Sequence, residues 1–413
     1  MKKLLLGLGV SNSSIKNYFD KHKIEYDVYD SNKNINLNEY DMIIKSNGFK
    51  NDYPLLIKAR LNHLMIYNDL GLFVQYKKDS YNSILVTGSN GKTTIVSLLE
   101  EVINNGKAIG NNGLPFFDYI DENYNYILEV SSFMLETAKN VRFKYNVITN
   151  LFITHLEHHG SFVNYIKSKC SFLKHIKKDS FVIYNYDDVL LRRIVNNYEC
   201  EKVSFSRKNK LCDLFICDNY IYYHNNKLFS IENLNLLGEH NLYNIMSVLG
   251  VLMNYDDKKD NYLDIIKNFK GVKHRIELIS DGKVKIYNDS KSTNYNALRV
   301  SLDCFKDKKV LLIVGGKKRE ENFDIIKDSL KQIYLVYAFG ENRDNMKSFF
   351  KKEGIKCKTF IDLNHLVNDL PINDENIDVI LFSPAATSFD LYNNFEERGI
   401  HFKRLINKLL EKY

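Results

Sequence analysis

Cysteine is scarce in this sequence, and the few cysteines present form no paired motif. The 413 residues include six, at irregular positions and without any C-x-x-C spacing. A disulfide scaffold or a zinc ribbon would need paired or regularly spaced cysteines. The pattern favours free thiols in a reducing compartment, and we expect a cytoplasmic protein. The six residues are Cys170, Cys200, Cys212, Cys217, Cys304 and Cys357.

Long apolar runs are also missing. No stretch approaches the roughly 20 residues that a helix needs to span a bilayer. Residues 1–7 resemble the start of a secretory signal, because two lysines precede a short leucine run. That run is too short, and no cleavage site of small residues follows before charged residues return. We therefore expect neither secretion nor membrane insertion.

A concentrated basic stripe, which nucleic-acid binding would require, is absent as well. The net charge is +7, but the 58 Lys and Arg residues are interleaved with 51 Asp and Glu residues along the whole chain. This distribution indicates a general compositional bias toward lysine, and we expect no nucleic-acid partner.

Strand-like apolar runs alternate with helix-like segments over three blocks, approximately residues 1–79, 80–273 and 274–413. Such alternation predicts an α/β protein with parallel sheets, whose ligands bind at the carboxyl ends of the strands. The length is also that of two or three domains. The clearest strand-like runs are residues 4–6, 42–44, 84–87, 126–130, 147–149, 181–184, 310–314, 333–337 and 379–382.

The first block opens with a strand and a glycine turn, residues 7–14. The G-x-G lacks the third glycine of a dinucleotide fingerprint, so a nicotinamide cofactor is disfavoured. The turn can still offer N–H groups to a phosphate, and a nucleotide diphosphate is the better hypothesis. A turn that merely connects a strand to a helix stays open as the alternative.

The second block contains the most informative motif. An apolar run, residues 84–86, leads into Thr-Gly-Ser-Asn-Gly-Lys-Thr-Thr at residues 87–94 and then a helix-like segment. A glycine turn at a helix N-terminus directs backbone N–H groups at phosphates. Lys92 can then reach the β- and γ-phosphates, and the Thr93 hydroxyl can bind Mg²⁺. Val86 replaces the first glycine of the usual phosphate loop, and a chance surface turn is the alternative.

Candidate metal ligands follow this loop. Glu129 ends an apolar strand, where a carboxylate that binds Mg²⁺ is expected, although an ordinary strand-end charge is the simpler interpretation. His155, His158 and His159 form a cluster that suggests a metal, and zinc first. No cysteine is near, and we expect the adjacent side chains of His158 and His159 to diverge. A single ligand, His155, for a hard cation is therefore the favoured prediction.

These motifs, in this order, resemble those of the Mur ligases, which are ATP-dependent amide ligases. The resemblance spans almost the full length, and its C-terminal signature is similar to that of the branch that adds D-glutamate. The diamino-acid branch's D-N-P-R signature is absent. The segments that carry it are residues 87–94, 110–115, 129–133, 150–157, 238–244, 274–277, 288–294, 383–390 and 395–399.

The resemblance implies three domains: a Rossmann-like N-terminal domain for a UDP substrate, a central P-loop ATPase-like domain and a Rossmann-like C-terminal domain for the amino acid. It implies an enzyme that uses ATP and Mg²⁺ to join UDP-N-acetylmuramoyl-L-alanine to D-glutamate through an acyl phosphate, in peptidoglycan precursor synthesis. We expect it to act as a monomer.

The resemblance also assigns residues. Lys169, which composition alone describes as a surface helix lysine, matches a lysine that is carbamylated in the family. The implied metal ligands are Thr93, Glu129, His155 and carbamylated Lys169, and the implied catalytic residues are Lys92, Glu129, His155, Lys169 and Lys291. The implied ATP site comprises Gly88, Ser89, Asn90, Gly91, Lys92, Thr93, Thr94, Asn244, Arg275 and Asp289. The implied substrate site comprises Val10, Ser11, Ser31, Gly48, Asn111, Ser131, Thr293, Arg319, Ser388 and Phe395.

Some positions depart from the family pattern. Thr154 precedes His155 where an acid is common, and Met134 stands where a glutamine often contacts the substrate. Arg319 replaces a lysine, so that Lys317 or Lys318 is an alternative for its role. Two other functions stay open: a ligase similar to folylpolyglutamate synthases, and a non-catalytic nucleotide-binding relative. A ligase similar to folylpolyglutamate synthases should lack a UDP-binding N-terminal domain, whereas about 80 residues precede the phosphate loop here.

Overall fold

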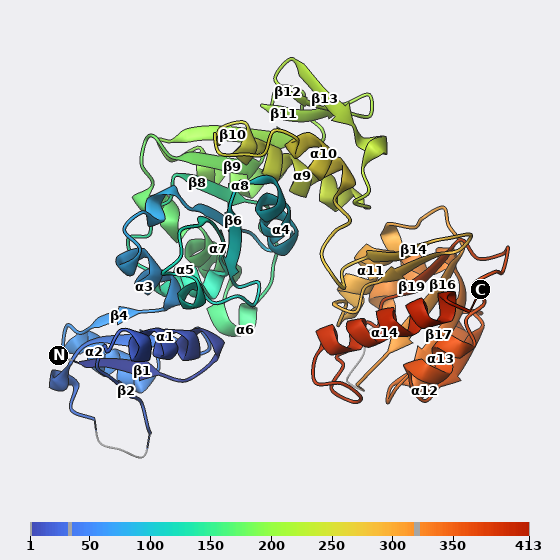
Figure 1. The fold of residues 1–413 in the computed structure, drawn as a ribbon, viewed down its shortest axis with the longest axis horizontal. Helices are drawn as coiled ribbons and strands as arrows, with labels where there is room; N and C mark the ends of the chain where they lie inside the picture. The colour runs from blue at the N-terminus through green and yellow to red at the C-terminus, as the bar shows by residue number, and fades with distance from the viewer. Residues whose placement is uncertain (1, 32–34, 318–322, 413) are drawn as a thin grey trace. The chain divides into compact units, whose positions relative to one another are not determined.

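The structure, a computed structural model, describes residues 2–31, 35–317 and 323–412. Three β-sheets in which most neighbouring strands are parallel organise the chain (Figure 1). The predicted α/β class is confirmed. The chain forms two compact units, residues 1–234 with 240–268, and residues 235–239 with 269–413. The first unit contains two of the sheets.

The first sheet has four parallel strands in the order β2-β1-β3-β4. Leucines alternate between its faces along β1: Leu4 and Leu6 pack with Leu56 of α2, whereas Leu5 packs with Ile15 of α1. This period of two is what a strand buried on both faces requires. The elements are β1 (Lys2–Leu6), α1 (Val10–Lys21), β2 (Tyr26–Val28), β3 (Tyr40–Lys45), α2 (Pro54–Leu61), β4 (Met65–Tyr67) and α3 (Asp69–Tyr76).

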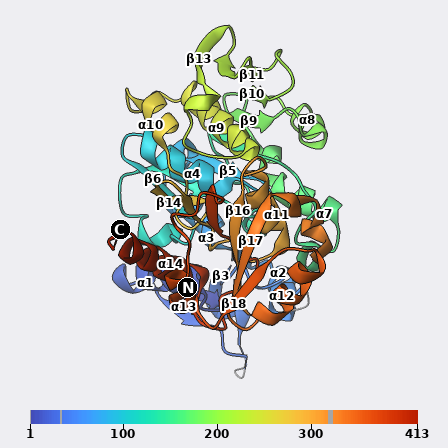
Figure 2. The ribbon, with the colours of Figure 1, turned by 90° about the vertical axis from the view of Figure 1, so that its right-hand side faces the viewer.

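The second sheet has nine strands in the order β13-β12-β11-β10-β9-β8-β5-β7-β6. The seven strands β5 to β11 are parallel to one another. Strands β12 and β13 add an antiparallel ribbon at one edge, which projects in both Figures 1 and 2. The strands are β5 (Ile84–Thr87), β6 (Gly106–Gly110), β7 (Asn125–Glu129), β8 (Tyr145–Ile148), β9 (Phe181–Asn185), β10 (Glu201–Ser206), β11 (Leu214–Cys217), β12 (Tyr220–Tyr223) and β13 (Asn226–Ser230).

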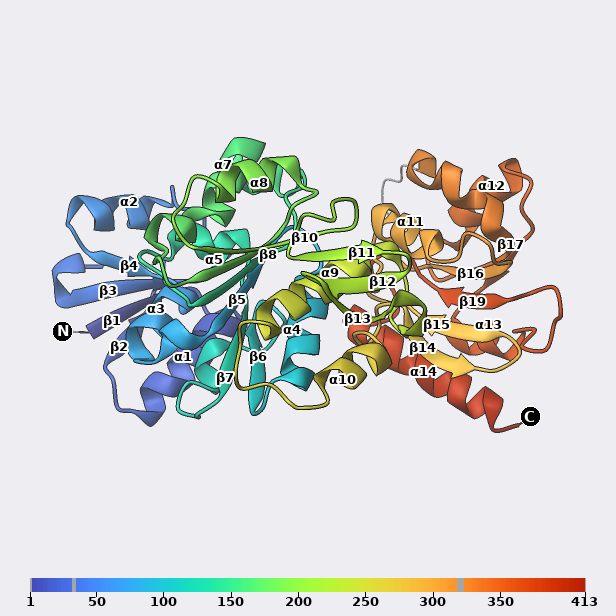
Figure 3. The ribbon, with the colours of Figure 1, turned by 90° about the horizontal axis from the view of Figure 1, so that it is seen from above.

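Helices cover both faces of the second sheet. Helices α5, α7 and α8 lie on one face, and α4 and α9 lie on the other (Figure 3). The helices are α4 (Lys92–Val102), α5 (Ser132–Thr137), α6 (Leu156–His159), α7 (Phe162–Lys169), α8 (Val189–Val195), α9 (Glu239–Leu252) and α10 (Tyr262–Asn268).

One apolar cluster joins the first two sheets. It contains Leu5 and Phe73 from the first sheet and its helices, together with Leu85, Phe116 and Leu128 from the second. The rings of Phe73 and Phe116 lie 5.2 Å apart between centroids. The two sheets therefore share a continuous core.

The third sheet has the order β14-β15-β19-β16-β17-β18, in which only β14 is antiparallel to its neighbour. Helices α11 and α12 pack on one face, and α13 and α14 pack on the other. The elements are β14 (Glu277–Asp281), β15 (Lys285–Asn288), α11 (Tyr295–Asp303), β16 (Val310–Gly315), β17 (Ile333–Phe339), α12 (Arg343–Lys352), β18 (Cys357–Phe360), α13 (Leu363–Asn368), β19 (Val379–Phe382) and α14 (Phe395–Leu410). No helix of the described residues is long and apolar enough to cross a bilayer.

Candidate functional site

The glycine turn after β5 has the backbone that its sequence predicts. Gly88 and Gly91 have φ values of 142° and 92°, which residues with a side chain rarely adopt. A Cβ on Gly88 would lie 1.8 Å from Thr149 Oγ1, and one on Gly91 would lie 2.3 Å from Asn244 Oδ1. Helix α4 begins at Lys92 directly after the turn. Both glycines are thus required by conformation and by close packing.

The turn is held by the segment that follows β8. The Ser89 N–H donates to the Asn150 carbonyl (3.0 Å), and the Asn90 N–H donates to Asn150 Oδ1 (2.9 Å). The Thr149 hydroxyl donates to the Asn90 carbonyl at 2.6 Å. Strands β5 and β8 are parallel, with Thr87 paired to Ile148, so their carboxyl ends lie side by side. The sheet therefore positions the turn before any ligand binds.

Two lysines converge on one carbonyl of this turn. Lys92 Nζ lies 2.8 Å and Lys169 Nζ 2.9 Å from the Gly88 oxygen. Lys169 is only 2% exposed, contrary to what its composition alone suggests. Burial, together with the neighbouring Lys92 charge, lowers the pKa of Lys169 well below its usual range. Lys169 therefore provides an amine that can lose its proton next to the phosphate loop.

Glu129 lies at the carboxyl end of β7, beside the turn. Glu129 pairs with Val86 of the neighbouring strand β5 and is only 2% exposed. Oε1 accepts a hydrogen bond from Asn111 Nδ2 at 3.0 Å. Oε2 is buried and has no hydrogen-bond partner among the described residues. A buried carboxylate oxygen without a donor is expected to bind a cation, so this residue fits the predicted Mg²⁺ site.

The other predicted ligands of this region differ in exposure. Thr93 is partly buried and Thr94 is buried in the first turn of α4. His155 has a φ of 55° and immediately precedes α6, and 46% of its side chain is exposed. Its ring lies 5.1 Å from that of Phe133. An exposed imidazole at a helix start can act as a metal ligand without rearrangement of a core.

The expected divergence of His158 and His159 is wrong. Their ring centroids lie 4.8 Å apart, and His158 Nε2 lies 2.9 Å from Glu136 Oε2. Helix α6 is a single turn of four residues, and both rings pack around Phe133, at 4.5 and 5.5 Å. A shared aromatic neighbour draws together two side chains that an extended segment would separate.

In the first sheet, the predicted UDP residues lie at the carboxyl ends of β1, β2 and β3. Val10 and Ser11 begin α1, and Gly48 follows β3. Ser31 lies three residues beyond the end of β2 and is exposed. Asn111 is exposed after β6, and Ser131 caps α5 by accepting the Met134 N–H. All six belong to the first unit.

The third sheet carries Asp289, which follows β15 and is 3% exposed. Its Oδ2 accepts the hydroxyls of Ser301 and Ser383, and its Oδ1 accepts the Ile276 N–H. Burial raises the pKa of Asp289 to about 6 in spite of these donors. The side chain that the resemblance assigns to the ATP site therefore also organises the loops around it.

Other predicted residues of the second unit follow or precede the strands of the same sheet. Lys291 is partly buried, with Nζ 5.5 Å from the centre of the Phe395 ring. Ser388 is buried and Thr293 is partly buried. Arg275 is partly buried near the start of β14. Arg319 lies outside the described residues, so the choice among Arg319, Lys317 and Lys318 stays a prediction.

The chain matches known sequences in the same regions. Residues 86–252 match the Mur ligase middle domain family. Over 381 residues the chain is 32% identical to UDP-N-acetylmuramoylalanine–D-glutamate ligase of Oceanobacillus iheyensis, covering 89% of this chain and 84% of that protein. The chain belongs to this branch of the Mur ligase family. The enzyme of the same name from Caldicellulosiruptor bescii is 29% identical over 390 residues, covering 91% and 85% of the two chains.

Solved Mur ligase structures have the same fold. UDP-N-acetylmuramate-alanine ligase MurC of Thermotoga maritima covers the whole of both chains with a TM-score of 0.60 at 17% identity. MurF ligase of the same organism, in complex with ADP, has a TM-score of 0.56 at 19% identity and covers 89% of this chain and 90% of its own. At these identities the likeness establishes the three-sheet Mur ligase fold.

Sequence reasoning missed Arg398 in this Mur ligase. Arg398 is fully buried, and its guanidinium donates to Ser290 Oγ (3.0 Å), the Ser290 carbonyl (2.8 Å) and the Ala386 carbonyl (2.9 Å). It thereby ties the loop after β15 to the loop after β19. The only available signal was an arginine inside the last family motif, where its neighbours gave no indication of burial.

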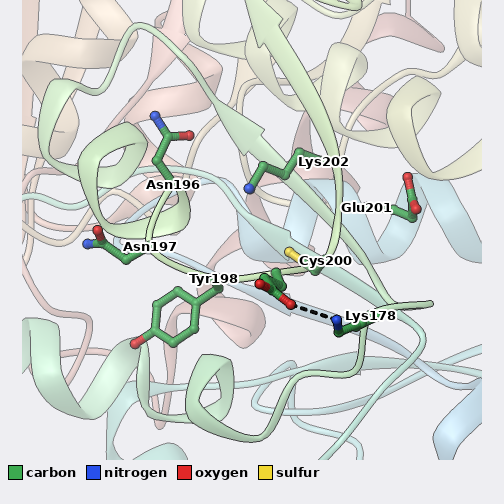
Figure 4. Close-up of a pocket in the computed structure, with 8 residues that line it drawn as sticks. Lys178, Asn196, Asn197, Tyr198, Cys200, Glu201 and Lys202 are labelled. Carbon is green, nitrogen blue, oxygen red and sulfur yellow. Dashed lines mark ion pairs between the residues drawn. The ribbon is translucent and has the colours of Figure 1, made fainter.

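A shallow hollow elsewhere on the second sheet is not the site of this chemistry. It is lined by Lys178 and residues 196–202 (Figure 4). Lys178 Nζ lies 2.8 Å from Glu199 Oε2. Lys178 precedes β9, and residues 196–202 precede or begin β10; both strands run parallel to β8 and β5. The hollow therefore lies at the amino ends of the strands, opposite the phosphate loop.

Proposed function

We propose that this Mur ligase joins D-glutamate to UDP-N-acetylmuramoyl-L-alanine at the expense of ATP, and releases ADP and phosphate. The observation that carries the proposal is the arrangement at the carboxyl ends of β5 and β7. Lys92 and Lys169 converge there on the Gly88 carbonyl, and Glu129 presents a buried oxygen that has no hydrogen-bond partner within the described part of the chain. The 32% identity to a ligase of this name, across most of both chains, supports the choice of substrates.

The reaction needs ATP because a carboxylate is a poor electrophile. The γ-phosphoryl group leaves ADP and bonds to the alanine carboxylate, which becomes an acyl phosphate. The amine of D-glutamate then attacks the acyl carbon, the C–O bond to phosphate breaks, and the nitrogen loses a proton. Phosphoryl transfer depends mainly on positioning and on neutralising negative charge. The groups at the phosphate loop supply both.

Each residue at the loop has a role in this scheme. Lys92 exchanges its contact with the Gly88 carbonyl for the β- and γ-phosphates, while the turn's N–H groups hold the phosphate chain. Thr93, Glu129 and His155 hold Mg²⁺, which offsets the phosphate charge when it is bound. Gly88 to Thr94 form the phosphate cradle, and Asn244, which lies against Gly91, completes its wall.

Lys169 contributes as a carbamate in this proposal. A neutral lysine amine adds to CO₂ and releases one proton, which converts a cation into a carboxylate-like metal ligand. The lowered pKa of Lys169 supports this step, because only the deprotonated amine is nucleophilic. The resulting negative charge also relieves the repulsion from Lys92.

The substrates are assigned to the three sheets. Residues 1–79 hold the UDP group through Val10, Ser11, Ser31 and Gly48, and residues 80–273 hold ATP.

Residues 274–413 hold D-glutamate. In that segment Thr293, Ser388 and the Phe395 backbone contact the amino acid, Lys291 lies at the reacting groups, and Arg275 and Asp289 complete the ATP site. Asn111 and Ser131 contact the muramoyl substrate. The six cysteines are free thiols, which supports a cytoplasmic site of action. We also propose that the enzyme acts as a monomer.

The test is phosphate release from ATP by the purified chain with Mg²⁺. The proposal requires both UDP-N-acetylmuramoyl-L-alanine and D-glutamate, with omission of either reducing the rate to background. L-glutamate and a folate substrate serve as controls for the folylpolyglutamate-synthase-like alternative. Activity with another amino acid would refute the substrate assignment. Tight ATP binding without turnover would favour the non-catalytic relative.

A further inference from the structure

Three potential metal ligands lie together on residues that the proposed function does not use. Glu136 of α5 and His158 and His159 of α6 each offer one ligand atom, and the three atoms lie within 4.8 Å of one another. The closest pair is His158 Nε2 and Glu136 Oε2, at 2.9 Å. Two short helices, α5 ending at Thr137 and α6 beginning at Leu156, thus bring two imidazoles and a carboxylate to one place.

His159 of the cluster is buried, whereas Glu136 and His158 are partly exposed, so an ion can reach them from solvent. The side chains of Glu136 and His158 are 24% and 12% exposed, and His159 is 6% exposed. Ser132 Oγ lies 3.0 Å from His159 Nε2 and fixes the orientation of that ring. The Phe133 ring packs against both imidazoles. The ligands are therefore held by their surroundings, as ligands of a metal site usually are.

The spacing suits a small tetrahedral ion. Two ligand atoms about 2.0–2.1 Å from a tetrahedral Zn²⁺ lie roughly 3.3 Å from each other. The His158–Glu136 pair at 2.9 Å is about 0.4 Å closer than this separation, and the other separations are at most 4.8 Å, so a side-chain movement of no more than about 1.5 Å would bring all three atoms into range. Without an ion, the pair can only form a hydrogen-bonded contact between His158 and Glu136.

We propose that Glu136, His158 and His159 bind a divalent transition-metal ion of the Zn²⁺ class. Two nitrogens and one carboxylate oxygen are a donor set that Zn²⁺ accepts, whereas Mg²⁺ prefers oxygen ligands. A water molecule supplies the fourth ligand. The ion ties α5 to α6 and so fixes Phe133, whose ring also contacts His155 at 5.1 Å. Metal binding here is independent of whether the proposed reaction is correct.

The test is equilibrium dialysis of the untagged, chelator-treated chain against Zn²⁺, in excess Mg²⁺ and without nucleotide, followed by elemental analysis. We expect one tightly bound Zn²⁺ per chain. His158→Ala and Glu136→Gln should each weaken binding by more than about 100-fold, because the loss of a group that merely orients a ligand costs about 10- to 100-fold. Thermal unfolding with and without Zn²⁺ verifies that each variant folds, and the zinc-dependent rise in Tm should be lost with the binding.

Two further variants make the result specific. His365→Ala removes an exposed histidine that also contacts a carboxylate, Asp362, at 2.8 Å, and it should bind Zn²⁺ like the unaltered chain. His155→Ala should do so too. If His155→Ala abolishes binding while His158→Ala retains it, the zinc occupies the proposed Mg²⁺ site and the inference is wrong. Absence of tight binding to the unaltered, folded chain also overturns it.

Discussion

Two buried basic residues, one in each compact unit, differ in the groups that surround them. Lys169 of α7 is 2% exposed, and its ammonium has the Gly88 carbonyl at 2.9 Å and the Thr87 hydroxyl at 3.5 Å. Arg398 of α14 is fully buried, but three donor atoms of its guanidinium have acceptors at 2.8–3.0 Å. Lys169 thus has one short hydrogen bond and one long one, whereas each of the three nitrogens of Arg398 has a hydrogen-bond acceptor.

The pKa values follow this difference. Burial and the charge of Lys92 lower the pKa of Lys169 well below its usual range. Burial lowers the pKa of Arg398 only to about 10, so the guanidinium stays charged near pH 7. Similar burial thus accompanies a lysine amine with a lowered pKa in one unit and a charged arginine that links two loops in the other. Delocalised charge and several donors make arginine the suitable residue for the second role.

The largest effect should come from removing the charge beside Lys169. Lys92→Ala is expected to reduce turnover by more than about 1,000-fold, because the phosphates lose their direct cation in a site that works by charge stabilisation. Phosphate release in the presence of both substrates measures this. Lys167→Ala, an exposed lysine on α7, should stay within twofold of the unaltered chain. Near-normal turnover of Lys92→Ala would show that the phosphate loop is misassigned.

Arg398→Leu tests the other side of the comparison. The change leaves the Ser290 hydroxyl and carbonyl and the Ala386 carbonyl without their donor, and buried groups without partners cost about 1–3 kcal/mol each. We expect a loss of about 3–4 kcal/mol in the free energy of unfolding, measured by urea denaturation. Arg404→Leu, an exposed arginine of the same helix, should change it little. An equally small loss in Arg398→Leu would exclude a cross-linking role.

Lys169→Ala should reduce turnover by about 100-fold, equal to about 2.7 kcal/mol of transition-state stabilisation. Added acetate should restore part of the rate if the missing group is a carbamate, since acetate can supply the lost carboxylate. Carbon-13 NMR of the unaltered chain in labelled bicarbonate should show a carbamate signal that Lys169→Ala lacks. If the variant is slow, acetate does not restore its rate and its spectrum matches that of the unaltered chain, Lys169 acts as an amine and not as a carbamate.

The smallest effect is a pH dependence at Asp289, beside the loops that Arg398 holds. Its folded pKa of about 6 exceeds the ordinary value of 3.8 because burial disfavours the charge. The folded state therefore binds the proton more tightly, and this contribution to stability is lost as the pH rises through 6. Relative to Asp289→Asn, the unaltered chain should lose about 1.4 kcal/mol between pH 5 and pH 8. Urea denaturation at both pH values measures the free energy of unfolding. The same change between pH 5 and pH 8 in both proteins would contradict the raised pKa.

Local sequence patterns predicted the secondary structure well where a pattern repeats over several residues. The apolar run before Gly88, the glycine turn and the helix that begins at Lys92 all have the expected form. The alternation of apolar runs and helices correctly indicated parallel sheets. These features depend on neighbours in the sequence, which is why the sequence alone reveals them.

Features that depend on distant packing were not predictable in this way. The lysine-rich end of α7 suggests an exposed lysine, yet Lys169 is buried because the helix packs toward Thr87 and Gly88, some eighty residues earlier. His158 and His159 converge because α6 is one turn long and the Phe133 ring of α5 packs against both imidazoles. The hydrogen bonds of buried Arg398 likewise reach Ser290, which lies 108 residues away along the chain.

The shared apolar cluster of the first two sheets limits how the chain can be recombined. A chimera joined at residue 79 separates Phe73 from Phe116 and Leu85, and the new halves must match each other's side-chain shapes to restore the ring contact. Exchange of residues 269–413 instead leaves that cluster intact. A chimera that takes its C-terminal segment from another ligase is therefore better joined near residue 269 than at residue 79.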